Sequence, residues 1–243
     1  MRNVRAFLVL AAFFAFTLPL MPLQLLFLKT GSRYARTFPH WYHRQVCRIV
    51  GIRLNVAGEV ARDEGVLLIA NHVSWLDIVA VHAVCPEARF VSKAEVQRWP
   101  LLNRLVASAE TIYLERERKR DARRVVHHMA EVLAAGGTVA AFPEGTTGDG
   151  RALLPFHANL LQAAISTATP VQPLALRYAD AHHAVSPAAL WLGETTLLGS
   201  VWKLACARGL VVHLRVLPPM ATAHADRRAL AATLREQIEE GLR

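Results

Sequence analysis

An uninterrupted apolar run, Val66-Leu67-Leu68-Ile69-Ala70, is the feature that most restricts how this chain can fold. It lacks the polar alternation of a strand with one face in water, so it predicts a strand buried on both faces. Such strands belong to sheets that helices cover on both sides. Five further segments have strand character, namely residues 89–92, 111–114, 138–142, 171–177 and 211–217.

Helical patterns separate these strand segments. Residues 121–135 put apolar side chains on one face, begin at Asp121 as a capping residue and stop at two glycines. A second helix is expected over residues 158–167, and a third from Asp226 repeats Leu or Ile at intervals of four. This alternation predicts an α/β fold. We expect residues 51–243 to form a single domain, with a mixed, largely parallel sheet flanked by helices.

The first part of the chain is strongly apolar. Residues 6–28 contain no charged side chain, and about twenty such residues can cross a bilayer as a helix. Pro19 and Pro22 interrupt the segment, so a bent hairpin within one leaflet is an alternative to a straight span. A secretory signal peptide is a third interpretation, but the run is long for one and no small-x-small cleavage site ends it. We expect residues 1–50 to be a membrane anchor that ends in a basic amphipathic helix over residues 38–51.

Cations follow the apolar segment and indicate the side of the membrane. They are Lys29, Arg33, Arg36, Arg44 and Arg48. Cations beside an apolar segment favour the cytoplasmic face and its anionic headgroups. The formal net charge is +9, and without a nucleic-acid motif a membrane surface or an anionic substrate explains it better. We therefore expect the chain at the inner (cytoplasmic) membrane, with residues 51–243 on the cytoplasmic side.

Cysteine and histidine usage gives no sign of a disulfide framework or a metal site. The three cysteines, Cys47, Cys85 and Cys206, are scattered along the chain, which fits a reducing compartment. The pairs His127-His128 and His182-His183 lack further ligands at metal-binding spacing. No metal or prosthetic group is expected.

His72 stands after Asn71, where the strand of the opening run emerges into a loop. Open α/β sheets place their chemistry at such loops. Asp77 can fold back against the imidazole if a helix begins between the two, which would fix the ring's tautomer and leave the other nitrogen as a base. Alternatively, Ser74 and Asp77 form a capping box that only satisfies backbone donors. The two interpretations are compatible, because a capped helix start would hold Asp77 rigidly near His72.

Two further segments come directly after strands. Residues 143–150, Pro-Glu-Gly-Thr-Thr-Gly-Asp-Gly, form a loop whose backbone donors can approach an anion, and the Glu144 carboxylate could hold a substrate hydroxyl. A surface turn is the simpler interpretation of this composition. Arg116 is the first cation after residues 111–114 and can reach the edge of the sheet as a bidentate phosphate ligand. The rest of its charged run is expected to be a solvated turn.

Four blocks, in order, resemble the glycerolipid acyltransferases. They are Asn71-His72-x4-Asp77, Ile112-Tyr113-Leu114-Glu115-Arg116, Phe142-Pro143-Glu144-Gly145-Thr146 and Val171-Gln172-Pro173-Leu174. Lys93-x-Glu95, between the first two blocks, is also similar to the family. The chain looks most like the bacterial 1-acyl-glycerol-3-phosphate acyltransferases, and the resemblance covers residues 30–220.

The resemblance implies transfer of a fatty acyl chain from acyl-CoA or acyl-carrier protein to a lysolipid hydroxyl, without a covalent enzyme intermediate. The implied product with 1-acyl-sn-glycerol-3-phosphate is phosphatidic acid. It implies that His72 is the general base and that Asp77 orients it. The implied substrate-binding residues are Arg116 for the phosphate, Glu144, Gly145 and Thr146 for the glycerol part, Pro173 on the acyl-donor side, and Lys93.

The sequence departs from the family pattern in two places. Glu110 stands where the second block commonly opens with glycine, and Thr147 stands where the third block commonly continues with arginine. The missing arginine, with Gly-Thr-Thr-Gly-Asp-Gly before Leu154-Pro155-Phe156, resembles lyso-ornithine lipid acyltransferases. Their acceptor carries an amino acid headgroup and no phosphate, and Asp149 could pair with such an amine. This acceptor is the alternative to the phosphate-bearing one.

Two other classes of function fit the sequence less well. A thioester or ester hydrolase needs an activated nucleophile, and the nearest hydroxyl, Ser74, lies in no Gly-x-Ser-x-Gly elbow. A non-catalytic lipid-binding protein would keep the apolar anchor and its cations, but it would have no use for His72 and Asp77 together. The sequence therefore favours a membrane-associated O-acyltransferase.

Overall fold

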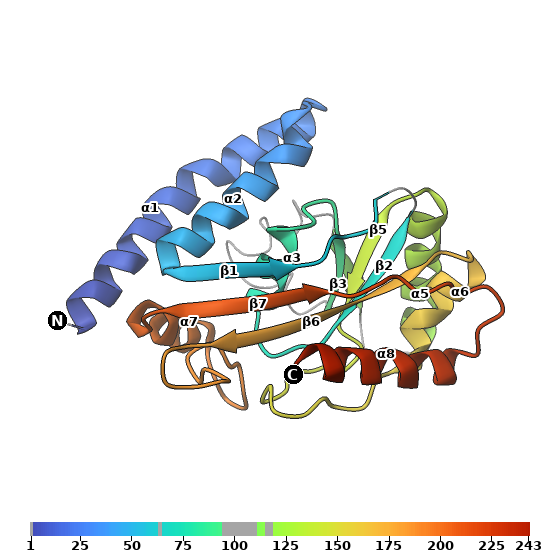
Figure 1. Cartoon of the computed structure of the whole chain (residues 1–243). Coiled ribbons are helices and arrows are strands. Elements are labelled where there is room, and N and C mark those ends of the chain that lie inside the picture. Colours follow the sequence, from blue (N-terminus) through green and yellow to red (C-terminus); the bar gives the residue numbers. More distant parts are fainter. Residues whose placement is uncertain (1, 63–64, 94–110, 115–118) are drawn as a thin grey trace.

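A seven-stranded sheet organises the residues that the computed structural model describes, which are 2–62, 65–93, 111–114 and 119–243 (Figure 1). The strands are β1 Ile52–Ala57, β2 Val66–Ala70, β3 Arg89–Lys93, β4 Ile112–Leu114, β5 Thr138–Ala141, β6 Val171–Ala179 and β7 Leu210–Val216. Their order across the sheet is β1-β7-β6-β2-β5-β3-β4. Among these described strands only β6 and β7 are antiparallel neighbours, so the predicted mixed, largely parallel α/β sheet is confirmed.

The strand β1 was not predicted. It pairs with β7 at the edge of the sheet, where Ile52 is buried and most of its other side chains are exposed. Its sequence Ile-Arg-Leu-Asn-Val-Ala therefore lacks the apolar run that marks a central strand. By contrast, all the residues of β2 and β5 are buried, as the opening run implied.

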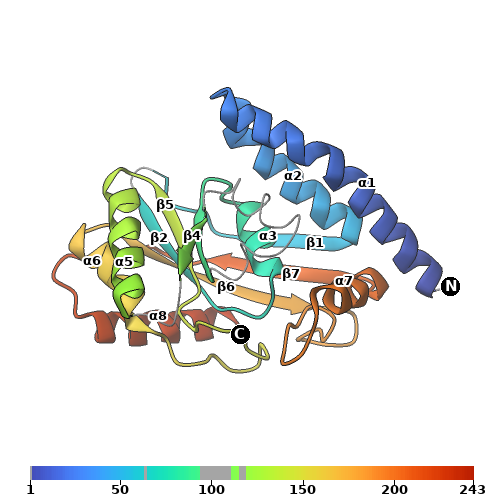
Figure 2. The same ribbon diagram turned by 180° about the vertical axis from the view of Figure 1, so that it is seen from behind.

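Helices cover both faces of the sheet (Figure 2). One face packs against α3 (Leu76–His82), α7 (Leu197–Cys206) and α2 (Tyr34–Val50). The other packs against α5 (Lys119–Ala134), α6 (Gln162–Ser166) with the 3-10 turn η2 (Ala158–Leu161), and α8 (Arg227–Gly241). Buried apolar side chains on both faces are the main source of stability.

The predicted helices are present with shifted ends. The helix expected from Asp226 is α8, and the Asp226 side chain caps it by accepting from the N–H groups of Arg228 and Ala229. The prediction that Asp121 caps α5 is wrong, because that helix begins two residues earlier, at Lys119. The helix start expected between His72 and Asp77 is present as α3, which begins at Leu76, whereas α7 was not predicted.

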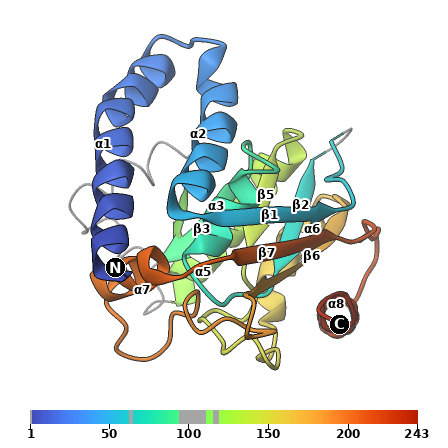
Figure 3. The ribbon, with the colours of Figure 1, turned by 60° about the vertical axis from the view of Figure 1, so that its left-hand side comes forward.

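The first fifty residues form a helical hairpin (Figure 3). The α1 helix, Arg2–Lys29, stays continuous through Pro19 and Pro22, so the prolines do not make a hairpin inside the apolar segment. The hairpin is instead made by α1 and α2, which are joined by the Tyr42 hydroxyl donating to Thr17 Oγ1 over 3.0 Å. The basic helix expected over residues 38–51 begins four residues earlier, at Tyr34, and ends at Gly51 in the left-handed conformation, φ +77°.

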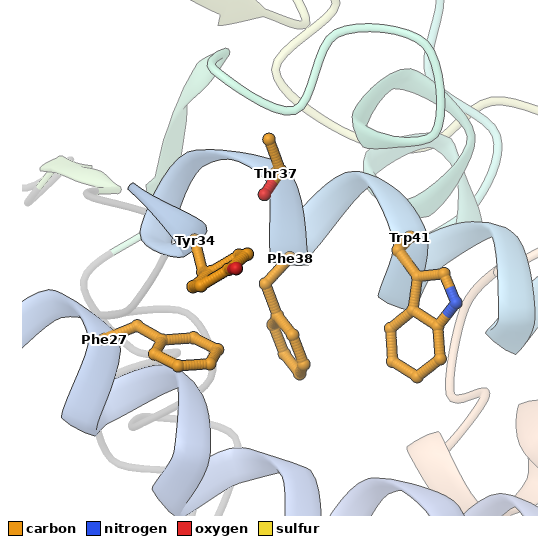
Figure 4. Close-up of a pocket in the computed structure, with 5 residues that line it drawn as sticks. All are labelled: Phe27, Tyr34, Thr37, Phe38 and Trp41. Carbon is orange, nitrogen blue, oxygen red and sulfur yellow. The ribbon is translucent and has the colours of Figure 1, made fainter. Parts of the chain in front are cut away.

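Outside its contacts with α2 and α7, α1 presents apolar side chains to the surroundings. Val4, Phe7 and Leu8 are 65, 71 and 64% exposed, and the helix is long and apolar enough to cross a membrane. Near the turn of the hairpin, Phe27 from α1 and four residues of α2 line an open pocket, in which three further aromatic rings gather (Figure 4). Aromatic rings beside cations such as Lys29 and Arg33 are typical of a protein segment at the membrane–water interface.

Candidate functional site

The strand β2 delivers His72 to the carboxyl edge of the sheet, and Asn71 fixes the direction in which the chain leaves. The register pairs Ala70 with Leu174 of the parallel neighbour β6. One position later the Asn71 side chain continues this ladder: its Nδ2 donates to the Leu176 carbonyl over 2.9 Å, and its Oδ1 accepts from the Leu176 N–H over 2.8 Å. Asn71 therefore holds the start of the His72 loop against the sheet.

His72 and Asp77 meet as the sequence predicted. The His72 Nδ1 lies 2.8 Å from the Asp77 Oδ2, and Asp77 is fully buried whereas the His72 side chain is 20% exposed. The same carboxylate oxygen accepts from the N–H groups of Val73 and Ser74 over 2.8 and 2.9 Å. Asp77 thus caps the start of α3 and orients the imidazole at once. With the proton on Nδ1 facing Asp77, Nε2 is the basic nitrogen.

The imidazole is also held by ring stacking. Phe142, at the end of β5, lies parallel to the His72 ring, with 4.0 Å between centroids and 9° between planes. Phe90 of β3 stacks behind Phe142 at 5.6 Å. Because β2, β5 and β3 are neighbours in the sheet, their side chains fix the ring from one side.

The loop of residues 143–150 wraps around the backbone of His72. The Glu144 Oε1 accepts from the His72 N–H over 2.7 Å, and its Oε2 accepts from the Leu154 N–H over 2.9 Å. The His72 carbonyl in turn accepts from the Gly148 N–H over 2.7 Å. Burial raises the pKa of Glu144, although these N–H donors and His72 act in the opposite direction. The carboxylate expected to meet substrate therefore also ties two parts of the site together.

The loop has a sharp turn at Gly145. Its φ of +69° is a conformation that side chains disfavour, and its N–H donates to the Phe142 carbonyl over 3.1 Å. Thr146 comes next and is exposed at the tip of this turn. The hydroxyl of Thr147, which stands at the arginine position of the family, donates to the Trp191 carbonyl over 2.5 Å.

Four residues around the site were not predicted as part of it. Trp191 donates its N–H to the Val73 carbonyl, and the indole N–H of Trp75 donates to the buried Ser200 Oγ, each over 3.0 Å. The hydroxyl of Tyr178, on β6, lies beside the buried Asp77 carboxylate, and burial together with this negative charge raises its pKa well above the usual range. Only Trp75 had a local signal, since it stands inside the His72–Asp77 motif; the others are distant in sequence.

The remaining predicted site residues have different positions. Pro173 is buried in β6, where it pairs with Ile69 of β2, the residue three positions before His72. The Pro173 carbonyl accepts from the Leu217 N–H. Lys93 is the last residue of β3. Asp149 is exposed, and its carboxylate accepts from the Arg151 N–H. Arg116 and Glu110 lie outside the described residues.

Comparison with known proteins identifies the family of this chain. A family model described as acyltransferase matches residues 53–177, which include both His72 and the loop of residues 143–150. A lyso-ornithine lipid O-acyltransferase of Brucella abortus is 34% identical over 253 residues, covering 97% of this chain and 93% of the relative. A 1-acyl-sn-glycerol-3-phosphate acyltransferase of Neisseria meningitidis is 34% identical over 197 residues, covering 78 and 74%.

A solved structure has the same fold. The crystal structure of the 1-acyl-sn-glycerophosphate (LPA) acyltransferase PlsC from Thermotoga maritima aligns with a TM-score of 0.73 at 19% identity, covering 100% of this chain and 96% of that one. The alignment therefore includes the helical hairpin as well as the sheet.

Proposed function

Because the chain belongs to the acyltransferase family, we propose that this lysolipid O-acyltransferase acylates a lyso-ornithine lipid at a membrane surface, with His72 as its general base. The observation that carries the catalytic part is the 2.8 Å contact between His72 Nδ1 and the buried Asp77 carboxylate. It leaves Nε2 at the partly exposed side of the ring to accept a proton.

The reaction needs one base and no enzyme nucleophile. His72 Nε2 takes the proton of the acceptor hydroxyl as its oxygen attacks the thioester carbonyl of acyl-CoA or acyl-carrier protein. A carbon–oxygen bond forms, the carbon–sulfur bond breaks, and the imidazolium returns the proton to the leaving thiolate. Alignment of the hydroxyl against the thioester supplies much of the rate, and the base adds about 10²–10⁴-fold. Asp77 stabilises the imidazolium that forms between the two proton transfers.

The binding roles of the other residues belong to the same proposal. Glu144, Gly145 and Thr146 lie on the loop that wraps His72, so a substrate bound there is next to the base. Pro173 is proposed on the acyl-donor side, and Lys93 and Arg116 are proposed as substrate-binding cations.

For the acceptor, the comparisons favour lyso-ornithine lipid over 1-acyl-sn-glycerol-3-phosphate, which was the first interpretation of the sequence. Relatives described as lyso-ornithine lipid O-acyltransferases match as well as those described as 1-acyl-sn-glycerol-3-phosphate acyltransferases, and the Brucella one matches over more of the chain. Two features of the loop support the same choice. Thr147 replaces a phosphate-directed arginine and is engaged by Trp191, and Asp149 is an exposed carboxylate suited to an amine.

Membrane attachment is assigned to residues 1–50, and the catalytic domain to residues 51–243. The α1 helix packs beside α2 and also meets α7 of the catalytic domain (Figure 3). This arrangement supports a hairpin that lies in one leaflet rather than a straight span. The exposed cations Lys29, Arg33, Arg44 and Arg48 support the cytoplasmic face of the inner membrane.

The test is an acyl-transfer assay with membranes that contain wild-type protein or His72→Ala. Labelled acyl-CoA and acyl-carrier protein are each offered with lyso-ornithine lipid or with lysophosphatidic acid. We expect transfer to lyso-ornithine lipid, lost in the variant. Transfer to lysophosphatidic acid alone would overturn the acceptor but keep the reaction. Full activity of His72→Ala would overturn the mechanism.

A further inference from the structure

The α7 helix carries large apolar side chains on a face that the described chain leaves partly exposed. It contains no acidic residue, and the Thr196 hydroxyl caps its start by accepting from the Gly199 N–H over 3.1 Å. Leu198 is 77% exposed and Trp202, one turn later, is 38% exposed. Residues four apart lie on the same side of a helix. A helix on a water-facing surface would normally place polar residues there.

This face continues the exposed apolar surface of α1. The Arg5 guanidinium donates to the carbonyls of Ala205 and Ala207 at the end of α7, which joins the two helices directly. Near Arg5 along α1, Val4, Phe7 and Leu8 are 64 to 71% exposed. The N-terminal end of α1 and α7 lie along the same side of the molecule, away from α8 (Figure 3).

The surroundings of α7 favour a lipid surface as the occupant. Lys203 within α7 and Arg208 just after it are both exposed, which suits anionic headgroups. Trp is enriched at the boundary between headgroups and acyl chains, where its ring is apolar and its N–H is polar. Any bilayer that receives the first turns of α1 is within reach of Leu198, because α7 is packed against those turns.

The buried side of α7 reaches the site. Ser200 is fully buried and accepts the indole N–H of Trp75, three residues after His72. Through the loop that precedes α7, Trp191 holds the Val73 carbonyl. One side of α7 is thus exposed beside α1. The other side contacts Trp75 through Ser200, and the loop before α7 contacts Val73 through Trp191.

We propose that the Leu198–Trp202 face of α7 enters the lipid interface beside α1 and forms the bilayer-side rim of the site. A lysolipid that moves out of the bilayer at α7 then arrives next to His72 without crossing bulk water. The proposal concerns a contact surface and does not depend on which headgroup the acceptor carries.

The test measures depth in the bilayer at single labelled positions of the full-length protein. Cys206 is changed to Ser to reduce background labelling; Cys47 and Cys85 are buried. A fluorophore is attached in separate variants at Leu198→Cys, at Phe7→Cys and at Ala232→Cys, an exposed position on α8. Each is reconstituted in vesicles of phosphatidylethanolamine and phosphatidylglycerol with and without nitroxide-labelled lipid.

We expect quenching of at least about twofold at positions 198 and 7, and little at 232. Quenching at 7 but not at 198 would overturn the α7 contact and leave the α1 anchor standing, whereas quenching at neither would overturn both. A pyrene label at 198 that gives excimer emission without lipid quenching would identify a second copy of the chain as the occupant and also refute the proposal.

A functional arm links this surface to catalysis. Leu198→Glu should lower transfer to a lysolipid embedded in vesicles about 5–10-fold, while transfer to a dispersed short-chain acceptor changes less than about twofold. Ala232→Glu is the matched control. An equal loss with both acceptors would show that the substitution damages the site itself and would contradict a role as a lipid contact.

Discussion

Around His72 most polar groups are hydrogen-bonded to one another, whereas along α1 large apolar side chains are exposed. The His72 N–H, carbonyl and Nδ1 all have partners, which are Glu144, Gly148 and Asp77 respectively. On α1, Phe7 and Leu8 are 71 and 64% exposed. Buried polar groups are hydrogen-bonded in any globular protein, whereas a cluster of exposed large apolar side chains is unusual on a surface that faces only water.

The difference shows that proton transfer and contact with the membrane depend on separate regions of the molecule. A base that must accept and return a proton needs a fixed ring, and fixed polar groups must be fully hydrogen-bonded where water is excluded. A substrate with long acyl chains needs an apolar surface close to that ring. The two regions are joined through α7, which meets α1 at Arg5 and the His72 loop at Trp75. Variants that damage one region and spare the other can test this division.

The largest effect is expected at the base itself. His72→Ala removes proton transfer while Asp77 can still cap α3 through the Val73 and Ser74 N–H groups. We expect kcat to fall about 10²–10⁴-fold with vesicle binding unchanged, measured by acyl transfer and by flotation. His127→Ala, an exposed histidine on α5, is the control and should retain activity. Loss of vesicle binding in His72→Ala would contradict the separation of the two regions.

Charged substitutions on the exposed apolar surface of α1 should have the opposite effect: they should weaken vesicle binding and spare catalysis. Each large apolar side chain contributes about 1.5–3 kcal/mol when it leaves water, so Phe7→Glu with Leu8→Glu should weaken vesicle binding at least about 100-fold. Transfer to a dispersed short-chain acceptor should change little, because neither residue touches the His72 loop. Ala232→Glu on α8 controls for the added charge. Unaltered flotation of the double variant would remove α1 as the anchor.

The sequence predicted the central part of this arrangement because its signals are local. The run of β2 and the five-residue spacing of His72 and Asp77 are each contained in one stretch of chain, and the structure has both. The contacts of Glu144 with the His72 and Leu154 N–H groups could not be predicted, since they depend on two loops meeting. The same holds for Trp191 and Ser200, which come from beyond β6.

The edge strand β1 and the first residue of α5 were not predicted correctly, for a related reason. A central strand is apolar throughout, but β1 at the sheet's edge buries Ile52 and exposes most of its other side chains, so its pattern is weak. The capping prediction at Asp121 was wrong although Asp is a common cap, because α5 already begins at Lys119. Local propensity identified the helix but not its first residue.

Glu144→Gln distinguishes support of the base from contact with substrate. Gln offers one oxygen and places an amide N–H₂ against one of the two backbone donors, which should cost about 1–3 kcal/mol of stability. If Glu144 acts mainly through the His72 N–H, kcat should fall about 10–100-fold with KM nearly constant. A rise in KM for the lysolipid at constant kcat would assign it to the substrate instead. Glu131→Gln, exposed on α5, should change neither.

Acid should weaken the packing of the hairpin on the domain. His82 of α3 is buried against the ring of His43 of α2, and burial lowers its pKa to about 4. The folded state therefore resists its protonation, so stability is fully present above the unfolded pKa near 6.5 and is lost as the pH falls below it. At pH 5 the share of the loss that comes from His82 is about 2 kcal/mol, and the buried His43, whose pKa burial lowers to about 3, adds to it. Denaturant titrations at pH 7.5 and pH 5 measure it.

The matched variant is His82→Gln, whose amide keeps the bond that the His82 Nε2 makes with the Ala88 carbonyl. It should flatten the decline of stability between pH 7.5 and pH 5. An unchanged decline would place the acid-sensitive group elsewhere.

The smallest effect is expected at Tyr178, whose hydroxyl lies beside the Asp77 carboxylate. Tyr178→Phe removes a polar neighbour of that carboxylate without changing the shape of the core, so the imidazole becomes less well oriented. We expect kcat to fall about 3–10-fold, which corresponds to about 0.7–1.4 kcal/mol, and the acid limb of the pH–rate profile to shift.

Tyr42→Phe provides the comparison, because it also deletes a buried hydroxyl but loses a bond to Thr17 between α1 and α2. Tyr42→Phe should lower the free energy of unfolding about as much as Tyr178→Phe does, but it should leave the pH–rate profile unchanged. If both variants alter only stability, Tyr178 belongs with the packing of the sheet and the polar network around His72 ends at Asp77. If only Tyr178→Phe shifts the pH–rate profile, the polar network around His72 extends from Asp77 on α3 to Tyr178 on β6. The chain runs from β6 on to α7.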